Sequence, residues 1–474
     1  MSLARKIATN TGSQLIGKTL STILGLIAVF IMTRALGPEK FGWYATAAGF
    51  LQFIGLFSDF GFTLITTHLL SEAGADKEKI LYTSFTWRLT TSFLFNGLAA
   101  LIIFLFPYPV EVKLAVVIMS LSFFLIGLNQ VFVALYQSRL QSYIHMIGEV
   151  LGRIVLVLGV GLASFYNAGF YYMVGAITFA SLIFTAYLWI KSGGIKLQLD
   201  RATSRQLFHA MWPTALAVIF NSFYLQGDRV ILPLFVDQST VGLYAAAYRV
   251  LDIITQLAAL AMGIMLPLLT YAWSKGDKKE FASRAQTSLD LLSLILLPMT
   301  LASIALATPL ITFVGGQEFA SAGPILRALS FAVFGIVFGM TFGHIALSIN
   351  RQRQALWIYF SDAILSVVAY FIFIPRYGVW GAIGVTIFSE LVAGIALAIL
   401  AIYYSKFHPR LFTFTKILLA SLIMSVVLYL LRSYSVVLLI PLGVIIYGLL
   451  VILLKIVSKD TIKDILKPTP EKIA

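Results

Sequence analysis

The sequence predicts a polytopic α-helical membrane protein. Of its 474 residues, 59% are hydrophobic and only 11% are charged, whereas soluble domains carry roughly 25% charged residues. Apolar runs of about 20 residues recur along the whole chain, and each is long enough to cross a ~30 Å hydrocarbon core as a helix. A transmembrane β-barrel would need ~10-residue segments of alternating polarity, which the sequence does not show.

Hydropathy predicts about fourteen spans. Their approximate ranges are 13–35, 41–67, 80–106, 113–136, 144–166, 170–190, 207–236, 241–272, 284–306, 324–349, 355–375, 379–404, 412–431 and 434–456. We expect residues 1–195 and 196–408 to form two six-helix lobes. Residues 409–474 would add a helix pair and a basic cytoplasmic tail.

The formal net charge is +14, and the basic residues that cause it are distributed according to the predicted topology. Lys and Arg gather in alternate connecting segments, and the predicted outer segments hold only Arg34, Lys40, Lys113, Arg376 and Arg432. This positive-inside bias predicts that both termini lie in the cytoplasm, and the start of the chain reads as a leader into the first helix, not as a cleaved signal. Nucleic-acid binding is not expected, because no predicted inner loop is long enough to form a folded basic module.

No catalytic or metal site is expected. The chain has no cysteine, which excludes thiolate metal sites and cysteine nucleophiles. The longest predicted outer segment, about 307–323, holds Glu318 as its single acid. The sequence therefore predicts that the protein is not an enzyme.

A short bend is written twice. "LGPEKFGWYATAAGF" (Leu36–Phe50) recurs two hundred positions later as "VDQSTVGLYAAAYRV" (Val236–Val250), with Gly42 matching Gly242. Each copy lies at the predicted outer bend between the first two helices of a six-helix block, so the two halves should be parallel, with a substrate site between them near the midplane. We expect the two glycines to let neighbouring helices approach closely.

Three stretches carry a resemblance to a known family: "IMTRALGPEKFGWY" (31–44), "FSDFGF" (57–62) and "QGDRVILPLF" (226–235). The chain resembles the polysaccharide exporter branch of the multidrug/oligosaccharidyl-lipid/polysaccharide superfamily, the Wzx-type flippases, over about its first 400 residues. Twelve-helix members have no counterpart of the last two helices, about 412–456, although the related lipid II flippase also has fourteen.

The resemblance implies a flippase of the cytoplasmic (inner) membrane. It would move polyprenyl-diphosphate-linked oligosaccharide from the inner to the outer leaflet by alternating access, for the assembly of cell-surface polysaccharide. It would act as a monomer without a cofactor and alongside polymerase or glycosyltransferase partners. Two alternatives stay open, a peptidoglycan-precursor (lipid II) flippase and a cation-coupled multidrug exporter.

Charged residues inside the predicted spans should face the bundle interior, a partner or water, because a lipid-facing charge is costly. Depth and helical spacing suggest four pairs: Asp59 with Arg88, Glu149 with Arg153, Asp228 with Arg249, and His344 with Asp362. These groups either neutralise one another in the bundle or serve transport.

Arginines are candidates for substrate binding, because guanidinium groups suit phosphate oxygens. Arg229 and Arg249 are the strongest candidates for holding the diphosphate, and Arg249 has no counterpart in the first copy of the bend, where Gly49 stands. Arg88, Arg153 and Arg34 are further candidates.

Buried acids and one histidine are candidates for an ion-coupling or charge network, which would link transport to a proton or sodium gradient. They are Asp59, Glu149, Asp228, Asp252, His344, Asp362 and Glu390. Glu390 has no basic neighbour at its predicted depth.

Overall fold

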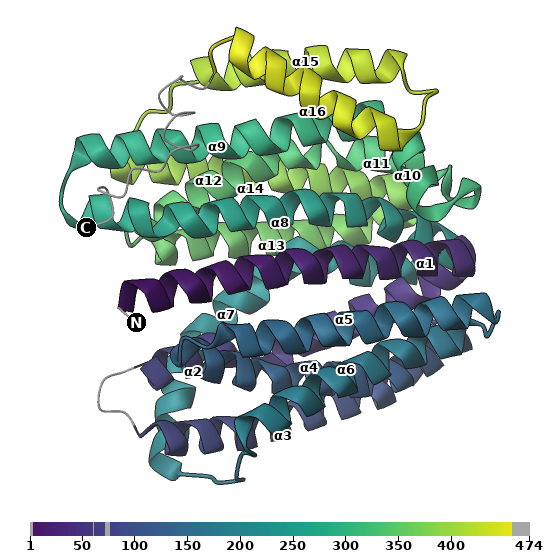
Figure 1. Ribbon diagram of the computed structural model, residues 1–474, viewed down its shortest axis with the longest axis vertical. Coiled ribbons are helices and arrows are strands. Elements are labelled where there is room, and N and C mark those ends of the chain that lie inside the picture. The colour runs from purple at the N-terminus through teal and green to yellow at the C-terminus, as the bar shows by residue number, and fades with distance from the viewer. Residues whose placement is uncertain (1–2, 60, 72–75, 457–474) are drawn as a thin grey trace. The chain divides into compact units, whose positions relative to one another are not determined.

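The computed structural model describes residues 3–59, 61–71 and 76–456, and within them it contains sixteen α-helices, three short 3-10 helices and no strand (Figure 1). The predicted all-α membrane class is therefore confirmed. Twelve of these helices are long and apolar enough to cross a membrane. The predicted basic tail lies, from residue 457 onward, outside the described residues.

The predicted number of fourteen spans stays a prediction, and two helices account for the difference from twelve. Helix α1 (Leu3–Asp59) merges the first predicted span with most of the second across a kink at Gly37, whose φ of 68° is left-handed. Helix α7 (Arg201–Ile231), predicted as a span at 207–236, is not among the twelve. It carries Gln226, Asp228 and Arg229 near its end.

The chain divides into two compact units, and the first contains residues 1–245 and 367–379. Besides α1 and α7 it contains the helices α2 (Phe62–Ser71), α3 (Lys77–Ile102), α4 (Val110–Ser138), α5 (Ser142–Phe165) and α6 (Phe170–Ser192), and the 3-10 helices η1 (Ile103–Leu105) and η2 (Leu232–Leu234). Within this unit α1 packs on α5, α5 on α6, and α3 on α4. A cluster of buried side chains that includes Phe85, Phe132 and Tyr136 forms its core.

Helices α1 and α5 run parallel, side by side. Gln14 Nε2 donates to Ser142 Oγ at 3.0 Å, and two turns later Ser21 Oγ donates to Glu149 Oε1 at 2.6 Å. Both hydrogen bonds join residues 128 positions apart, and a constant offset along two helices requires that they point in the same direction. This agrees with the prediction that the first and fifth spans cross the membrane in the same sense.

Helix α7 begins with an aspartate cap. Asp200 Oδ2 accepts hydrogen bonds of 2.8 Å from the amide and from the hydroxyl of Thr203, and Lys79 Nζ lies 3.0 Å from Asp200 Oδ1. These hydrogen bonds, with the lysine charge, lower the pKa of Asp200 to about 2. The cap satisfies amides that have no partner inside the first turn of a helix.

The second unit contains residues 246–366 and 380–474. Its elements are α8 (Gln238–Ser274) and α13 (Gln352–Tyr377), which each have one end in the first unit, and α9 (Lys278–Ala305), α10 (Ala307–Gly315), η3 (Gln317–Phe319), α11 (Ala322–Leu329), α12 (Ala332–Ser348), α14 (Val379–Ser405), α15 (Phe412–Leu430) and α16 (Val436–Leu453). The expectation of a loop at 307–323 is wrong, because α10, η3 and the start of α11 occupy it. The lobe boundaries expected near 195 and 408 stay a prediction.

The last helix pair packs on α9. Ser425 Oγ donates to the Leu301 carbonyl at 2.9 Å, and the Tyr447 hydroxyl donates to the Leu294 carbonyl at 3.0 Å. In each of these bonds a side-chain hydroxyl donates to a backbone carbonyl of α9. The donor lies on a helix more than 100 residues further along the chain. The predicted spans 412–431 and 434–456 thus form α15 and α16, and they are fixed to the second unit by polar contacts as well as by packing.

Candidate functional site

The two copies of the bend meet at their glycines. A Cβ atom on Gly42 would lie 2.7 Å from the carbonyl carbon of Gln238 and closer still to its oxygen. A Cβ on Gly242 would lie 2.9 Å from the carbonyl carbon of Pro38. The contact is reciprocal: Gly42 packs against Gln238, and Gly242 packs against Pro38, four residues before Gly42 as Gln238 is four before Gly242. Such an exchange is typical of an interface with two-fold symmetry. The predicted close approach at Gly42 and Gly242 is confirmed, and Thr46 Oγ1 adds a 2.7 Å hydrogen bond to Gln238 Oε1.

Asp59 and Arg88 form the ion pair that their depths predicted. Arg88 Nη2 lies 3.1 Å from Asp59 Oδ1, and the arginine is only 3% exposed. Its Nε donates to the carbonyl of Gly127 at 2.9 Å and its Nη1 to the carbonyl of Ser58. All three nitrogens of the guanidinium thus have partners within the protein, which favours a structural role for Arg88. Substrate binding by Arg88 stays a prediction.

Glu149 has a nearer cation than the expected Arg153. Glu149 Oε1 accepts from Ser21 and lies 3.5 Å from Lys18 Nζ, both on α1. The guanidinium of Arg153 lies one turn further along, where its Nη1 is 3.6 Å from the Cβ position of Gly25. The parallel register of α1 and α5 brings a lysine from another helix within reach of Glu149, so its stronger counter-charge comes from α1 and the weaker one from Arg153 on α5.

Asp228 and Arg249, two charges of the predicted second half, each have a close contact within their own unit. Asp228 Oδ2 accepts a 2.6 Å hydrogen bond from the hydroxyl of Tyr244, and Arg249 Nη1 lies 3.7 Å from Asp252 Oδ2, one turn along α8. Asp228 belongs to the first unit and Arg249 to the second, so their expected pairing stays a prediction. Sequence reasoning missed Tyr244, although it is one of the residues that the two copies of the bend share.

Two of the remaining candidates have their own partners. Arg34 is exposed, and its guanidinium lies over the ring of Phe30 with 4.3 Å between Cζ and the ring centroid. His344 Nδ1 is 2.7 Å from the carbonyl oxygen of Met340, one turn earlier on α12. His344 therefore does not pair with Asp362 as expected.

Asp362 lies among hydroxyl groups. Its Oδ2 accepts a 2.6 Å hydrogen bond from Ser389 on α14, and Ser366 Oγ donates to Ser389 Oγ at 2.9 Å. Asp362 is 2% exposed, and its Oδ1 has no hydrogen-bond partner among the described residues. Glu390, the next residue after Ser389, is 8% exposed.

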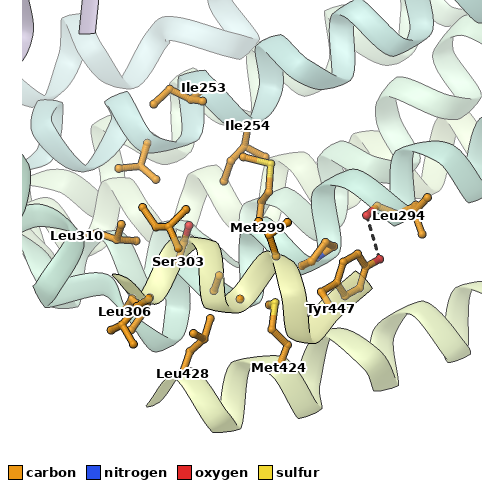
Figure 2. A pocket seen from close by; sticks show the side chains of 17 residues that line it. Ile253, Ile254, Leu294, Met299, Ser303, Leu306, Leu310, Met424, Leu428 and Tyr447 are labelled. Carbon is orange, nitrogen blue, oxygen red and sulfur yellow. Dashed lines mark hydrogen bonds between the residues drawn. The ribbon is translucent and has the colours of Figure 1, made fainter. Parts of the chain in front are cut away.

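An apolar cavity of about 450 Å³ lies within the second unit, bounded by α8, α9, α10, α15 and α16 (Figure 2). Its lining residues are almost all apolar: Val250, Ile253, Ile254, Leu294, Pro298, Met299, Ala302, Ser303, Leu306, Leu310, Met424, Leu428, Leu439, Ile440, Gly443, Val444 and Tyr447. Figure 2 shows the Tyr447 hydroxyl bonded to the Leu294 carbonyl. The hydroxyl of Ser303 is the remaining polar side-chain group of the lining. Such a surface is suited to hydrocarbon and offers little to a sugar or a phosphate.

The described residues contain no group of three or more His, Cys, Asp or Glu side chains that could hold a metal ion. The polar groups that they do bring together are ion pairs and hydroxyl–carboxyl contacts between membrane helices. Together with the twelve apolar helices and the hydrocarbon cavity, they define a multi-pass membrane protein with a charged interior, as in transporters.

Comparison with known proteins gives the family. Residues 31–324 match the family model described as "Polysaccharide biosynthesis protein", and the chain belongs to this family. The chain is 26% identical over 343 residues to the succinoglycan biosynthesis transport protein ExoT of Rhizobium meliloti, covering 69% of this chain and 66% of that protein. It is 22% identical over 400 residues to a putative O-antigen transporter of Shigella flexneri, covering 79% of this chain and 93% of that one.

Solved structures show the same fold. The inward-closed lipid II flippase MurJ superposes with a TM-score of 0.70 at 16% identity, covering 95% of this chain and 99% of that one. At this identity the likeness concerns the fold alone. With the family match, it confirms the predicted membership of the multidrug/oligosaccharidyl-lipid/polysaccharide superfamily and the polysaccharide branch within it.

Proposed function

We propose that this protein moves a polyprenyl-diphosphate-linked oligosaccharide from the inner to the outer leaflet of the cytoplasmic membrane by alternating access, for assembly of a cell-surface polysaccharide. The observation that carries the proposal is the apolar cavity, found in a chain of the polysaccharide biosynthesis family. An apolar site of this size does not match the polar surface of a free sugar. It does match the long hydrocarbon chain of a lipid-linked glycan.

Selection in the cavity would rest on shape. A lipid chain already surrounded by lipid gains little from the hydrophobic effect when it enters an apolar protein site, so packing decides what binds. A volume of about 450 Å³ lies within the usual range of ligand sites, roughly 300–1,000 Å³. The cavity would hold one segment of a long polyprenyl chain and leave the rest in the bilayer.

Arg229 and Arg249 remain our candidates for the diphosphate. Arg249 has a weak 3.7 Å contact with Asp252, which an incoming diphosphate with about two negative charges could replace. Arg88 is a weaker candidate, because its three nitrogens already bind protein oxygens. The protein would act without catalytic residues, as a monomer with both termini in the cytoplasm, and would supply its substrate to polymerase or glycosyltransferase partners.

The test is a leaflet-accessibility assay in proteoliposomes. The purified protein is reconstituted with a fluorescent polyprenyl-diphosphate oligosaccharide, and a membrane-impermeant reagent measures how much of it reaches the opposite leaflet. We expect protein-dependent transfer that Arg229→Ala and Arg249→Ala reduce and that Arg376→Ala, a substitution at an exposed arginine, leaves unchanged. Transfer of lipid II or of a cationic dye in place of this substrate would overturn the proposal in favour of one of the two alternatives.

A further inference from the structure

Asp362 is an acid inside a predicted membrane span, and the residues that the structure describes supply no counter-ion for it. It lies within the span Gln352–Tyr377, it is 2% exposed, and none of the described basic side chains forms an ion pair with it. Two less buried acids in the spans do have a cation, Asp59 with Arg88 and Glu149 with Lys18, whereas the equally buried Asp228 accepts a hydrogen bond from Tyr244. An isolated buried carboxylate is costly unless it is paired or neutralised, so the site is built for a carboxyl group that takes up a proton.

The backbone around this group is held in place by glycine contacts. A Cβ on Gly394 of α14 would lie 2.6 Å from the carbonyl oxygen of Gly335 on α12, and a Cβ on Gly335 would lie 2.6 Å from the amide nitrogen of Leu391. Small residues at such spacing let membrane helices touch along their backbones. The contact fixes α14 at the turn that carries Ser389, and so fixes the hydroxyl that donates to Asp362.

The hydroxyls leave one carboxyl oxygen for the proton. Ser366 donates to Ser389, and Ser389 donates to Asp362 Oδ2. Oδ1 is buried and has no partner within the described part of the chain, so a proton can occupy it without displacing an existing bond. We propose that Asp362 is the proton-binding group that couples transport to a proton gradient, with Ser389 as its positioning residue; this rests on the proposed function.

A proton fits the site better than a sodium ion does. A metal cation held away from water needs several oxygen ligands, whereas the two serine hydroxyls here already donate in a chain that ends at Oδ2, not at Oδ1. A proton needs one lone pair. The reaction is a plain exchange: the carboxylate gains H⁺ from one side of the membrane and releases it to the other, with no change of oxidation state.

Other titratable groups lie on the elements around Asp362, among them Tyr359, Glu390 and His344. Tyr359 is one turn earlier on α13, Glu390 follows Ser389 on α14, and His344 is on α12 with its Nδ1 at the Met340 carbonyl. A Cβ on Gly343 would lie 2.9 Å from the Tyr359 hydroxyl, which places that tyrosine against α12. Any measured proton binding must therefore be assigned by substitution at Asp362 itself.

Binding is tested first, without substrate. pH-difference infrared spectra of the purified protein report protonated carboxylic acids through their C=O stretch. We expect a band that appears as the pH is lowered, that Asp362→Asn abolishes, and that Asp290→Asn, a substitution of a half-buried acid on α9, leaves in place. Ser389→Ala keeps the acid but removes its donor to the ionised form, so the band should appear at a higher pH. The other carboxyl groups of the chain titrate in both proteins and cancel when the two spectra are subtracted, so the absence of any difference band between wild type and Asp362→Asn would overturn the assignment.

Coupling is tested second, in the leaflet assay. An imposed pH gradient should increase wild-type transfer, Asp362→Asn should lose that increase while it still equilibrates substrate, and Asp290→Asn should behave as wild type. A response to a sodium gradient at constant pH that Asp362→Asn abolishes would overturn the proton in favour of sodium. If the wild-type protein moves no lipid-linked glycan, the proposed function fails, whereas the infrared band still decides whether Asp362 binds a proton.

Discussion

The reciprocal glycine contact predicts that Gly42→Ala separates the two copies of the bend. The new methyl carbon would start 2.7 Å from the Gln238 carbonyl carbon and closer to its oxygen, whereas ordinary contacts begin near 3.4 Å. The backbones must therefore move apart by at least about 0.7 Å, and neither side of the contact is a flexible side chain. Overpacking of this kind typically costs about 1–3 kcal/mol, which corresponds to about a 5- to 150-fold loss of the state that has the contact.

The contact can be measured by cross-linking. The protein has no cysteine, so Thr46→Cys and Gln238→Cys introduce the only two thiols, at positions whose side-chain oxygens lie 2.7 Å apart. A short bismaleimide applied to membranes should join them readily. Adding Gly42→Ala should lower the yield by at least about fivefold, which is the low end of the range above.

Gly55→Ala is the matched control. Gly55 is on the same helix, and a Cβ there would meet nothing within 4 Å. Both substitutions bring the higher helix propensity of alanine, about 1 kcal/mol, so the comparison isolates the contact. Equal cross-linking yields in the Gly42→Ala and Gly55→Ala backgrounds would refute the reasoning, because they would show that the bends do not pack in this way in the membrane.

Three further predictions follow from the sites. Asp59→Asn should lower stability by about 3–5 kcal/mol, because it leaves the buried guanidinium of Arg88 without its counter-ion; thermal unfolding in detergent checks this. Val444→Trp, which fills the apolar cavity, should slow transfer of the lipid-linked substrate in the leaflet assay, whereas Ile445→Trp at the same depth outside the lining should not. Asp200→Asn should lower the melting temperature at neutral pH. The pKa of Asp200 is depressed from its ordinary value near 4 to about 2, so its stabilisation is present above that ordinary value, is lost as the pH falls toward 2, and the two melting temperatures should converge there.

The sequence predicted those features that depend on one helix or on depth alone. Apolar length identified the membrane class, and distance from a shared loop identified Asp59 and Arg88 as partners. The same reasoning missed the nearer cation of Glu149, because spacing along α5 offers Arg153 and says nothing of Lys18 on α1. That partner depends on the register between two helices 128 residues apart, which packing determines.

The hydroxyl site and the cavity could not be predicted for a similar reason. Ser389 is an ordinary polar residue in an apolar helix until α13 and α14 pack and bring it within 2.6 Å of Asp362. The cavity is formed by side chains from five helices, each unremarkable in its own sequence. Hydropathy is calculated for each helix separately, so it carries no information about a cavity that forms only when several helices pack together.

Packing explains why the first copy of the bend has Gly49 where the second copy has Arg249. Gly49 faces α7, where a Cβ would lie 3.2 Å from the carbonyl oxygen of Arg229 and 3.6 Å from its Cβ. An arginine at position 49 would have to start its side chain against that backbone, so the first copy has no room for the charge that Arg249 carries in the second. Arg249 instead lies one turn from Asp252 and contacts it at 3.7 Å. The glycines Gly42 and Gly242, which both copies keep, serve their mutual contact, whereas the space beside Gly49 is filled by the backbone of the helix that carries Arg229.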